Sequence, residues 1–548
     1  MPLAPRQPAS KFTTKMGLTR SLSLGIPERV QLSAGVIPVI DYTTEWPDSL
    51  KILIGGQSNA SGRGVVAGGE APSTLVQLFG NDYNLKQATE PIDNWTDRVD
   101  MVSDDSYNSL ALMHSFILKA AKDIATASGS RITVIPAMKG STSLVAWQNG
   151  ANRLDRATLF GSANYRALQA APSGLNCIFW YGHETQIARN YKEAWYTLHR
   201  RLREERGANL PLIYAQLGAS TSQATISTAH IPHSDILRRA ELNRGSDLVI
   251  GAKILDVNFS DAAQWTAGVP TGFTVSGSDA NNTVTYTANG ALLSGDGSKS
   301  LSLNKAAIFT NGQKYLIEAE VYSVTAGSFK LVYAGETYLY AAYYYRVAFT
   351  ASQTLLQVFR SNSGVANVIT LKSLKVWQYT SGEATEPLPL SHMVITFDQP
   401  LIDDQHLNTT GYIEVGRRFA LAYRQYVLGH TVNGTGPRLA ATGAFTHPSA
   451  DKSKVIVKFD KEITTGGATN YNGQFRVYDG VTEMTVSSAV RDTTDTTAVL
   501  ITMSATASGT VAVSYGDLAV ASTGITLLDV VKDTDLMPAP TFAKQTVV

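Results

Sequence analysis

Between residues 51 and 216 the chain alternates short apolar runs with longer stretches of helical period. The apolar runs are KILIG (51–55), RITVIP (131–136), LNCIFWY (175–181) and LPLIYAQ (210–216). Strands that are apolar along their whole length are typical of a parallel sheet with helices on both faces. The pattern therefore predicts an α/β fold, a doubly wound, three-layer domain of flavodoxin-like type.

The helical stretches lie at about 107–127 and 189–206, between the predicted strands. The same alternation returns near residue 385, with the apolar run MVITFD (393–398) and an amphipathic stretch at 409–428. We therefore expect a split α/β domain, with a first part at 49–257 and a second part at 385–432.

The sequence between the two α/β parts, 258–384, is rich in Thr, Ser, Gly, Val and Tyr and has short alternating strands separated by turn residues. Regular short strands predict an inserted β-sandwich, which we expect to be jelly-roll-like and to bind carbohydrate. Residues 433–548 have the same texture and predict a C-terminal immunoglobulin-like sandwich and tail. Residues 1–48 show no strong period and are interpreted as an extended arm or attachment segment.

Charge and cysteine content exclude several classes of function. The chain has 46 Lys and Arg against 45 Asp and Glu, and a near-neutral chain has no general attraction for nucleic acid or an anionic membrane. The single cysteine, Cys177, rules out an internal disulfide framework and a cysteine-based zinc site. No run approaches the roughly 18 apolar residues of a membrane span, and the polar N-terminus lacks the apolar core of a signal peptide.

Two short motifs carry residues suited to nucleophilic catalysis. Ser58 follows the first predicted strand in Gly55-Gly56-Gln57-Ser58-Asn59, at the edge where open α/β sheets bind ligands. A helix beginning there would place its positive end near developing negative charge. Asp403 and His406 follow the last predicted strand at a spacing that lets the carboxylate orient one imidazole nitrogen. Either motif alone is common by chance, but the chain order Ser, Asp, His is informative.

The combined pattern resembles the SGNH (GDSL-like) hydrolase family, in its sialate-O-acetylesterase-like carbohydrate esterase branch. Four blocks carry the resemblance, over about 51–250 and 390–430. They are Gly56–Asn59, Lys139–Leu144 with Trp147, Trp180–Thr185, and Asp403 to His406 with the helix Gly411–Tyr423.

This resemblance implies a role for each matched residue. Ser58 would be the nucleophile, His406 the general base and then general acid, and Asp403 the residue that orients His406. The backbone N–H groups of Ser58 and Gly140 would hold the oxyanion. We also expect Gln57, Asn59 and Glu184 to contact the substrate. No metal and no cofactor is expected.

The third block departs from the family pattern Trp-Tyr-Gln-Gly-Glu, because Gly182 and His183 stand in place of Gln-Gly. The expected side-chain donor of the oxyanion hole is therefore absent. The second block also has Ser141 where the family has a second glycine. We hypothesise that His183 supplies the missing donor through one ring N–H in its neutral form.

Two further groups weigh less. His230 and His233 form a His-x-x-His motif without an acidic or cysteine partner nearby, which favours a loop feature over a metal site. A run of tyrosines in the insert could stack on sugar rings, although tyrosine is also a common strand residue. The run is Tyr338, Tyr340, Tyr343, Tyr344 and Tyr345.

We therefore expect a serine esterase that removes O-acetyl groups from a carbohydrate, namely a bacterial surface polysaccharide such as O-antigen or capsule. The architecture also resembles bacteriophage tail and tailspike deacetylases, so we expect a virion tail protein that acts outside the cell and contacts other tail proteins through its N-terminal arm. A homo-oligomer is left open. The alternatives are a secreted bacterial carbohydrate acetylesterase and a non-catalytic receptor-binding protein on an esterase scaffold.

Overall fold

A computed structural model of the chain describes most residues from 40 onward, and Tyr42–Val548 form one compact unit. The described ranges are 40–104, 109–147, 153–183, 191–207, 209–216, 250–327, 329–333, 336–339, 344–360, 366–379, 390–403, 405–448, 452–464, 470–516 and 530–548. Most of the expected N-terminal arm (1–48) therefore lies outside the described residues, as do Glu184, His230 and His233.

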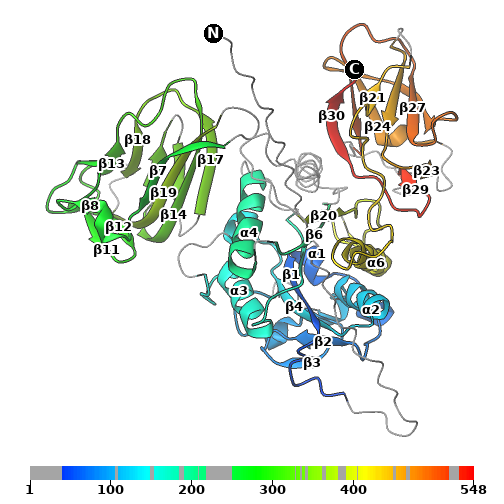
Figure 1. The fold of residues 1–548 in the computed structure, drawn as a ribbon, viewed down its shortest axis with the longest axis horizontal. Helices are drawn as coiled ribbons and strands as arrows, with labels where there is room; N and C mark the ends of the chain where they lie inside the picture. Colours follow the sequence, from blue (N-terminus) through cyan, green and yellow to red (C-terminus); the bar gives the residue numbers. More distant parts are fainter. Residues whose placement is uncertain are drawn as a thin grey trace, which may run out of the picture. The chain divides into compact units, whose positions relative to one another are not determined.

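A seven-stranded sheet forms the centre of the α/β domain (Figure 1). Its strand order is β20-β6-β5-β1-β4-β2-β3, and every neighbouring pair is parallel except β2 and β3. The strands are β1 (Leu50–Gly56), β2 (Val76–Phe79), β3 (Leu85–Gln87), β4 (Ile132–Met138), β5 (Cys177–Tyr181), β6 (Leu212–Ala215) and β20 (Ser391–Val394). The predicted doubly wound parallel sheet is confirmed.

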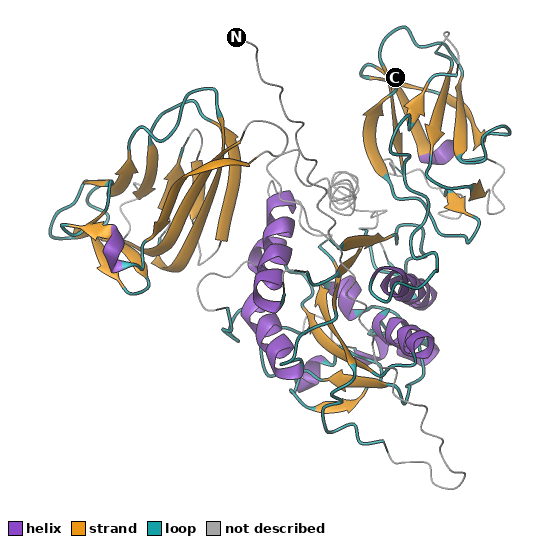
Figure 2. Ribbon diagram, viewed as in Figure 1, coloured by secondary structure: helices purple, strands orange, loops and turns teal. Residues whose placement is uncertain are grey.

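Helices cover both faces of this sheet, as continuous apolar strands require. Along β1, Ile52 and Ile54 pack on one face with α2 (Ile117–Ser128) and α6 (Thr409–Tyr426). Leu53 points to the opposite face and packs with α3 (Leu159–Ala170) and α4 (Tyr191–Arg206). Figure 2 shows the three layers, with helices on either side of the strands.

The helix expected at 107–127 begins ten residues later than predicted, at Ile117. Leu110–Leu112 forms a short 3-10 helix instead, and His114 pairs with Gly64 in an isolated antiparallel bridge. This long-range pairing holds the segment before α2 out of the helix, which local periodicity cannot indicate. The helix ends at Ser128, and the next residue, Gly129, caps it in the left-handed conformation with φ of 68°.

The connections reverse direction at β1, which lies between β4 and β5. The chain first runs outward on the β4 side and later builds β5, β6 and β20 on the other side. In open α/β sheets, ligands bind beyond the carboxyl ends of the strands at such a switch point. The segment after β1 therefore enters the crevice where chemistry is expected.

The insert consists of two mostly antiparallel sheets that share one apolar core. One sheet has the order β10-β13-β18-β15-β16, and the other β11-β12-β19-β14-β17, with β7 also paired to β19. The strands are β7 (Ile250–Asn258), β10 (Thr274–Ser276), β11 (Asn282–Thr287), β12 (Gly290–Gly295), β13 (Ser302–Lys305), β14 (Lys314–Ala326), β15 (Phe329–Val332), β16 (Glu336–Leu339), β17 (Tyr344–Thr350), β18 (Leu356–Arg360) and β19 (Asn367–Tyr379), besides the small pair β8 (Trp265–Thr266) and β9 (Val269–Pro270).

The antiparallel pairing of β7 with β19 places Ile250 opposite Tyr379. The sandwich therefore begins at Ile250, whereas the sequence texture placed the boundary at residue 258. The predicted first α/β part, 49–257, includes residues 250–257, because the change in composition comes near residue 257. Their hydrogen bonds go to the insert instead. Whether the insert is a jelly roll stays a prediction.

The C-terminal region also consists of antiparallel strands, in two four-stranded sheets and one two-stranded sheet. Their orders are β21-β22-β27-β26, β25-β24-β28-β30 and β23-β29. The strands are β21 (Phe445–Thr446), β22 (Lys454–Lys458), β23 (Ile463–Thr464), β24 (Phe475–Asp479), β25 (Thr482–Met484), β26 (Val486–Arg491), β27 (Ala498–Met503), β28 (Val511–Tyr515), β29 (Lys532–Asp533) and β30 (Phe542–Thr546). The immunoglobulin-like type stays a prediction.

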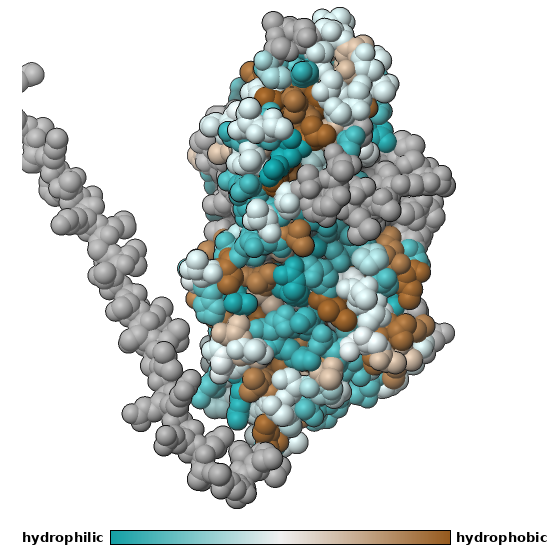
Figure 3. All heavy atoms as spheres, turned by 90° about the vertical axis from the view of Figure 1, so that its right-hand side faces the viewer, coloured by the Kyte–Doolittle hydropathy of each residue, from teal (hydrophilic) through white to brown (hydrophobic). Residues whose placement is uncertain are grey.

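The surface in Figure 3 carries hydrophobic side chains in small groups among polar ones. Large exposed hydrophobic residues of the described ranges are spread over separate segments of the chain, for example Val65, Val481 and Leu536. No helix in the described part of the chain combines the length and the apolar character needed to cross a membrane.

Candidate active site

Ser58 is the first residue of α1 (Ser58–Ser61), a four-residue helix that follows β1 after one intervening residue. The turn is tight because Gly56 adopts a φ of 134°, and a Cβ atom there would lie 1.9 Å from the backbone oxygen of Tyr181. Glycine is therefore required at the last residue of β1, two positions before the serine. A helix of four residues sums few peptide dipoles, so the stabilisation expected from a helix N-terminus is small.

Of the three residues predicted from the two motifs, His406 lies within hydrogen-bond distance of both Ser58 and Asp403. His406 Nε2 is 2.8 Å from Ser58 Oγ, and His406 Nδ1 is 2.6 Å from Asp403 Oδ2. A carboxylate only accepts, so Nδ1 carries the proton and Nε2 faces the serine hydroxyl as the acceptor. This arrangement allows the imidazole to take the Ser58 proton when the oxygen attacks an electrophile.

The Asp403 carboxylate is held in its ionised form. Burial raises the pKa of this carboxyl, but hydrogen bonds from the Gln405 N–H, the His406 imidazole and the His406 N–H outweigh it, so the pKa is lowered from its usual value. Oδ1 accepts both backbone N–H groups, at 2.9 Å from Gln405 N and 2.7 Å from His406 N. The short loop thus fixes the carboxylate against the imidazole.

Asn59, predicted to contact substrate, braces the histidine loop instead. Its side chain is buried, and its Nδ2 donates to the Gln405 carbonyl at 3.1 Å. Its Oδ1 accepts from Leu407 N at 3.4 Å and from the Tyr412 hydroxyl at 2.8 Å. These contacts flank His406 on both sides along the chain, and a buried amide already paired in this way has little capacity left for a ligand.

The last hydrogen bond between the β4 segment and β1 runs from Lys139 N to the Gly56 carbonyl, at 3.1 Å. Gly140 is the next residue after Lys139. The segment with Gly140 therefore follows β4 at the same sheet edge as Ser58, as the predicted oxyanion role requires. A Cβ atom on Gly140 would lie 2.4 Å from both carboxylate oxygens of Asp104. The glycine is needed at this place because the Asp104 carboxylate already occupies the side-chain position.

Two side chains form hydrogen bonds with the Thr142 carbonyl: Gln57, which was predicted to contact the substrate, and His183, which was predicted to donate to the oxyanion. Gln57 Nε2 donates to it at 2.6 Å, and His183 Nδ1 lies 3.0 Å from it. Both side chains are buried. Thr142 Oγ1 in turn accepts from Trp147 Nε1 at 3.0 Å, so the loop after β4 is fixed by several partners. Gln57 therefore supports this loop rather than facing a ligand through its amide nitrogen.

The same geometry argues against the hypothesis that His183 donates to the oxyanion. Burial lowers the pKa of His183 to about 4, although the hydrogen bond with Thr142 opposes the shift, so the ring is neutral near pH 7. A neutral imidazole has one N–H group, and a carbonyl partner requires it on Nδ1. Nε2 then has no proton to donate, and it has no hydrogen-bond partner among the described residues.

The remaining predictions cannot be placed at the site. Glu184 lies outside the described residues, as do His230, His233, Tyr340 and Tyr343. Within the ranges that the structure describes, no group of three or more His, Cys, Asp or Glu side chains could hold a metal ion.

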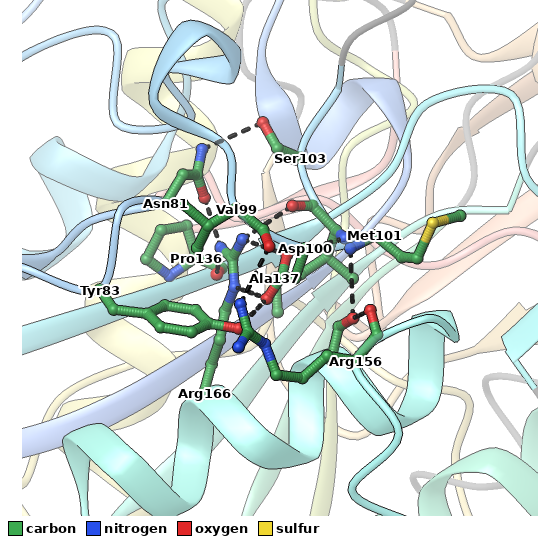
Figure 4. Close-up of polar contacts among 12 residues, drawn as sticks. Asn81, Tyr83, Val99, Asp100, Met101, Ser103, Pro136, Ala137, Arg156 and Arg166 are labelled. Atoms are coloured by element: carbon green, nitrogen blue, oxygen red, sulfur yellow. Dashed lines mark hydrogen bonds and ion pairs between the residues drawn. The ribbon is translucent and has the colours of Figure 1, made fainter.

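Sequence reasoning missed a buried charged network beside the Gly140 loop (Figure 4). Arg166 on α3 is fully buried and pairs with Asp100 through two nitrogens, Nε at 2.8 Å and Nη2 at 2.5 Å. It also donates to Asn81 Oδ1, the Pro136 carbonyl and the Val102 carbonyl. An arginine with every donor paired fixes its surroundings. Here it fixes the loop that leads to Asp104.

Residues 49–254 match the family model described as "Carbohydrate esterase, sialic acid-specific acetylesterase". The matched segment contains Ser58 but not Asp403 or His406. In the folded chain, His406 lies against Ser58, and Asp403 lies against His406. The protein is a carboxylic ester hydrolase. The predicted enzyme class is thereby confirmed.

Solved structures with some likeness to this hydrolase include a carbohydrate acetylesterase from Xanthomonas citri, with 14% identity, a TM-score of 0.48, and coverage of 90% of this chain and 80% of that one. A protein from Arabidopsis thaliana has 18% identity and a TM-score of 0.26 over 31% of this chain and 75% of its own. A xylan-binding domain from Paenibacillus barcinonensis has 15% identity and a TM-score of 0.17 over 24% and 97%. A search of curated proteins finds no significant match.

Proposed function

We propose that this hydrolase is an SGNH-type serine esterase that removes O-acetyl groups from a carbohydrate. The observation that carries the proposal is the hydrogen-bonded series from Ser58 to His406 to Asp403, in a chain whose segment 49–254 matches a carbohydrate acetylesterase family. A serine hydroxyl needs a base to attack an ester at neutral pH, and the imidazole at 2.8 Å supplies it.

The reaction proceeds in two stages. Ser58 Oγ attacks the acetyl carbonyl carbon while His406 Nε2 takes the hydroxyl proton, and the tetrahedral intermediate collapses as the histidine protonates the departing sugar oxygen. Water then attacks the acetyl-serine with its proton going to His406, and acetate leaves as Ser58 recovers its proton. Asp403 stabilises the charged imidazole in both stages, and the N–H groups of Ser58 and Gly140 hold the oxyanion.

We further propose that the substrate is an acetylated bacterial surface polysaccharide and that the protein belongs to a phage tail. The near-neutral net charge of +1 suits a protein that meets a polymer without general electrostatic attraction. Two β-rich regions, which the same chain carries in addition to the esterase domain, provide surface for polymer contact. A label on the chain should be found on virus particles, whereas its presence only in particle-free culture medium would favour the secreted alternative.

The activity is tested by acetate release from a panel of acetylated bacterial polysaccharides, with wild type compared with Ser58→Ala. Loss of the nucleophile should reduce release on the order of 10³-fold or more while the fold is retained. Ser61→Ala is a matched control, because Ser61 lies on the same short helix outside the series that connects Ser58 to Asp403. A Ser58→Ala protein that keeps more than about a tenth of wild-type release would contradict the nucleophile assignment. Polysaccharide binding without any release by wild type would favour the non-catalytic alternative.

A further inference from the structure

Asp104 places a buried carboxylate directly against the loop that carries Gly140. The residue is fully buried, and both of its carboxylate oxygens face the position that a Cβ atom on Gly140 would occupy. An ionised carboxylate so close to an oxyanion donor would disfavour the negative charge that develops in the transition state. Asp104 therefore needs a compensating positive charge if the Gly140 N–H is to work.

Arg63 supplies that charge. Its Nη2 forms an ion pair with Asp104 Oδ2, and its Nη1 donates to the Gly62 carbonyl at 2.7 Å. Both side chains are buried, so the pair is poorly screened by solvent. Arg63 follows α1 after one intervening residue, Gly62, so the ion pair connects the segment that begins at Ser58 with the loop at Gly140.

The carboxylate is held in place by its own backbone and by neighbouring elements. Asp104 N donates to Asp93 Oδ2 at 3.1 Å, and Ser103 N donates to the Met138 carbonyl at 2.6 Å, at the end of β4. Arg166 fixes the preceding loop through Asp100 (Figure 4). The position of Asp104 is therefore determined independently of its contact with Gly140.

Among the residues that the structure describes, Asp93 and Lys139 also carry charge near Asp104. Burial and the nearby Arg98 guanidinium lower the pKa of the Lys139 ammonium, while the negative charges of Asp104 and Asp93 act in the opposite direction. Asp93 Oδ1 accepts from Asn81 Nδ2 at 2.9 Å. Of these groups, Arg63 is the one whose cationic head is bonded to the Asp104 carboxylate and buried with it.

We propose that the Arg63–Asp104 ion pair is a charge-balanced support for the oxyanion-binding loop. Asp104 fixes Gly140 by filling the space beside its Cα atom, and Arg63 cancels the negative charge that this support introduces. Both are positioning residues, because neither is placed in contact with the reacting atoms. The proposal rests on the esterase function proposed above.

The proposal predicts unequal effects on turnover when the two halves of the pair are replaced. Arg63→Met removes the positive charge and leaves a buried carboxylate beside the oxyanion site, so kcat should fall on the order of 10²-fold with little change in KM. Asp104→Asn keeps the shape but removes the negative charge, so kcat should stay within about threefold of wild type although stability falls. The double variant Arg63→Met with Asp104→Asn should recover most of the kcat lost in Arg63→Met.

The experiment measures kcat and KM on 4-nitrophenyl acetate for these three variants, Ser58→Ala and the control Arg153→Met, with thermal unfolding of each. Arg153 pairs with Glu205 at 2.6 Å on partly exposed side chains, and its loss should leave kcat unchanged. A purely structural role would make the double variant at least as impaired as Arg63→Met, and that result overturns the proposal.

Two further outcomes also overturn the proposal. One is a folded Arg63→Met protein with kcat within about threefold of wild type. If Arg63→Met does not fold, a loss on the order of 10²-fold in folded Asp104→Asn is equally decisive. Inactive Ser58→Ala beside fully active Arg63→Met would defeat this inference alone, whereas no ester hydrolysis by wild type would defeat the proposed function and this inference together.

Discussion

At the scale of single residues, both oxygens of the Asp403 carboxylate accept hydrogen bonds from the same short loop. Oδ1 accepts the two backbone N–H groups, and Oδ2 accepts the imidazole N–H of His406. This leaves the carboxylate ionised and correctly oriented before a substrate arrives. Preorganised charge of this kind is worth more than charge that must reorient during the reaction.

Replacement of Asp403 by Asn should reduce kcat by about 10³- to 10⁴-fold, because an amide in this position favours the wrong imidazole tautomer. The measurement is acetate release at saturating substrate, with Asp404→Asn as the matched control. Asp404 lies outside the described residues, and the spacing of the motif assigns it no contact with His406. If Asp404→Asn is the variant that loses activity while Asp403→Asn keeps it, the assignment of the pair is wrong.

At the scale of elements, α6 fixes the position of the histidine loop. The helix begins at Thr409, three residues after His406, and Asn408 caps it by accepting from Gly411 N at 2.9 Å. Arg418 on this helix pairs with Asp398 through two nitrogens, at 2.6 and 2.8 Å. Both side chains are buried, so the ion pair ties the helix to the segment that follows β20.

This buried pair should contribute to acid unfolding. Burial raises the pKa of Asp398, but the charge and hydrogen bonds of Arg418 outweigh it, so the pKa lies below its usual value of 3.8. The associated stability is present above that value and is lost as the pH falls through the lower pKa of the folded state. Asp398→Asn should remove this acid-dependent part and cost up to roughly 3–5 kcal/mol at pH 7. The buried Arg418 would then keep Glu414 as its ionic partner, on Nε at 2.9 Å, but would lose the carboxylate that pairs with its two terminal nitrogens.

Urea unfolding at several pH values measures both effects. The double variant Asp398→Asn with Arg418→Met serves as the control, since it leaves no unpaired buried charge and should be more stable than Asp398→Asn alone. An Asp398→Asn protein with wild-type stability at pH 7 would show that the pair does not hold the helix.

At the scale of the whole molecule, the insert divides the catalytic residues along the chain. Ser58 precedes it and the Asp403–His406 loop follows it, and Ser58 and His406 are 348 positions apart in the sequence. The first and last strands of the insert, β7 and β19, are antiparallel neighbours, and Ile250 is the register partner of Tyr379. The two ends of the sandwich are therefore adjacent in space, which allows the sandwich to be removed without stretching the chain.

Replacement of residues 250–379 by a short linker should leave turnover of 4-nitrophenyl acetate within about threefold of wild type, since the triad lies outside the insert. Turnover of an acetylated polysaccharide should fall about tenfold or more if the insert recognises the polymer. The comparison uses both substrates on the same folded variant. An equal loss on both substrates would contradict a role in recognition.

The sequence by itself determined the parallel sheet, five of its strands (β1, β4, β5, β6 and β20), the helices α4 and α6, and the candidates Ser58, Asp403 and His406. Strands β2 and β3 and helix α3 were not predicted. These features are local, because strand and helix periods and a three-residue spacing are visible in a single stretch of chain. The catalytic candidates also stand directly after predicted strands, and parallel strands bring their carboxyl ends to one edge.

The tertiary structure decided the features that depend on partners far apart in sequence. The pairing of β7 with β19 moved the domain boundary, and the bridge of His114 to Gly64 shortened α2. Asn59 braces a loop 346 residues away, and His183 donates to a carbonyl 41 residues before it. A polar side chain near a catalytic motif has the same sequence signature whether it faces a ligand or a backbone carbonyl. Only the position of the partner in space separates the two.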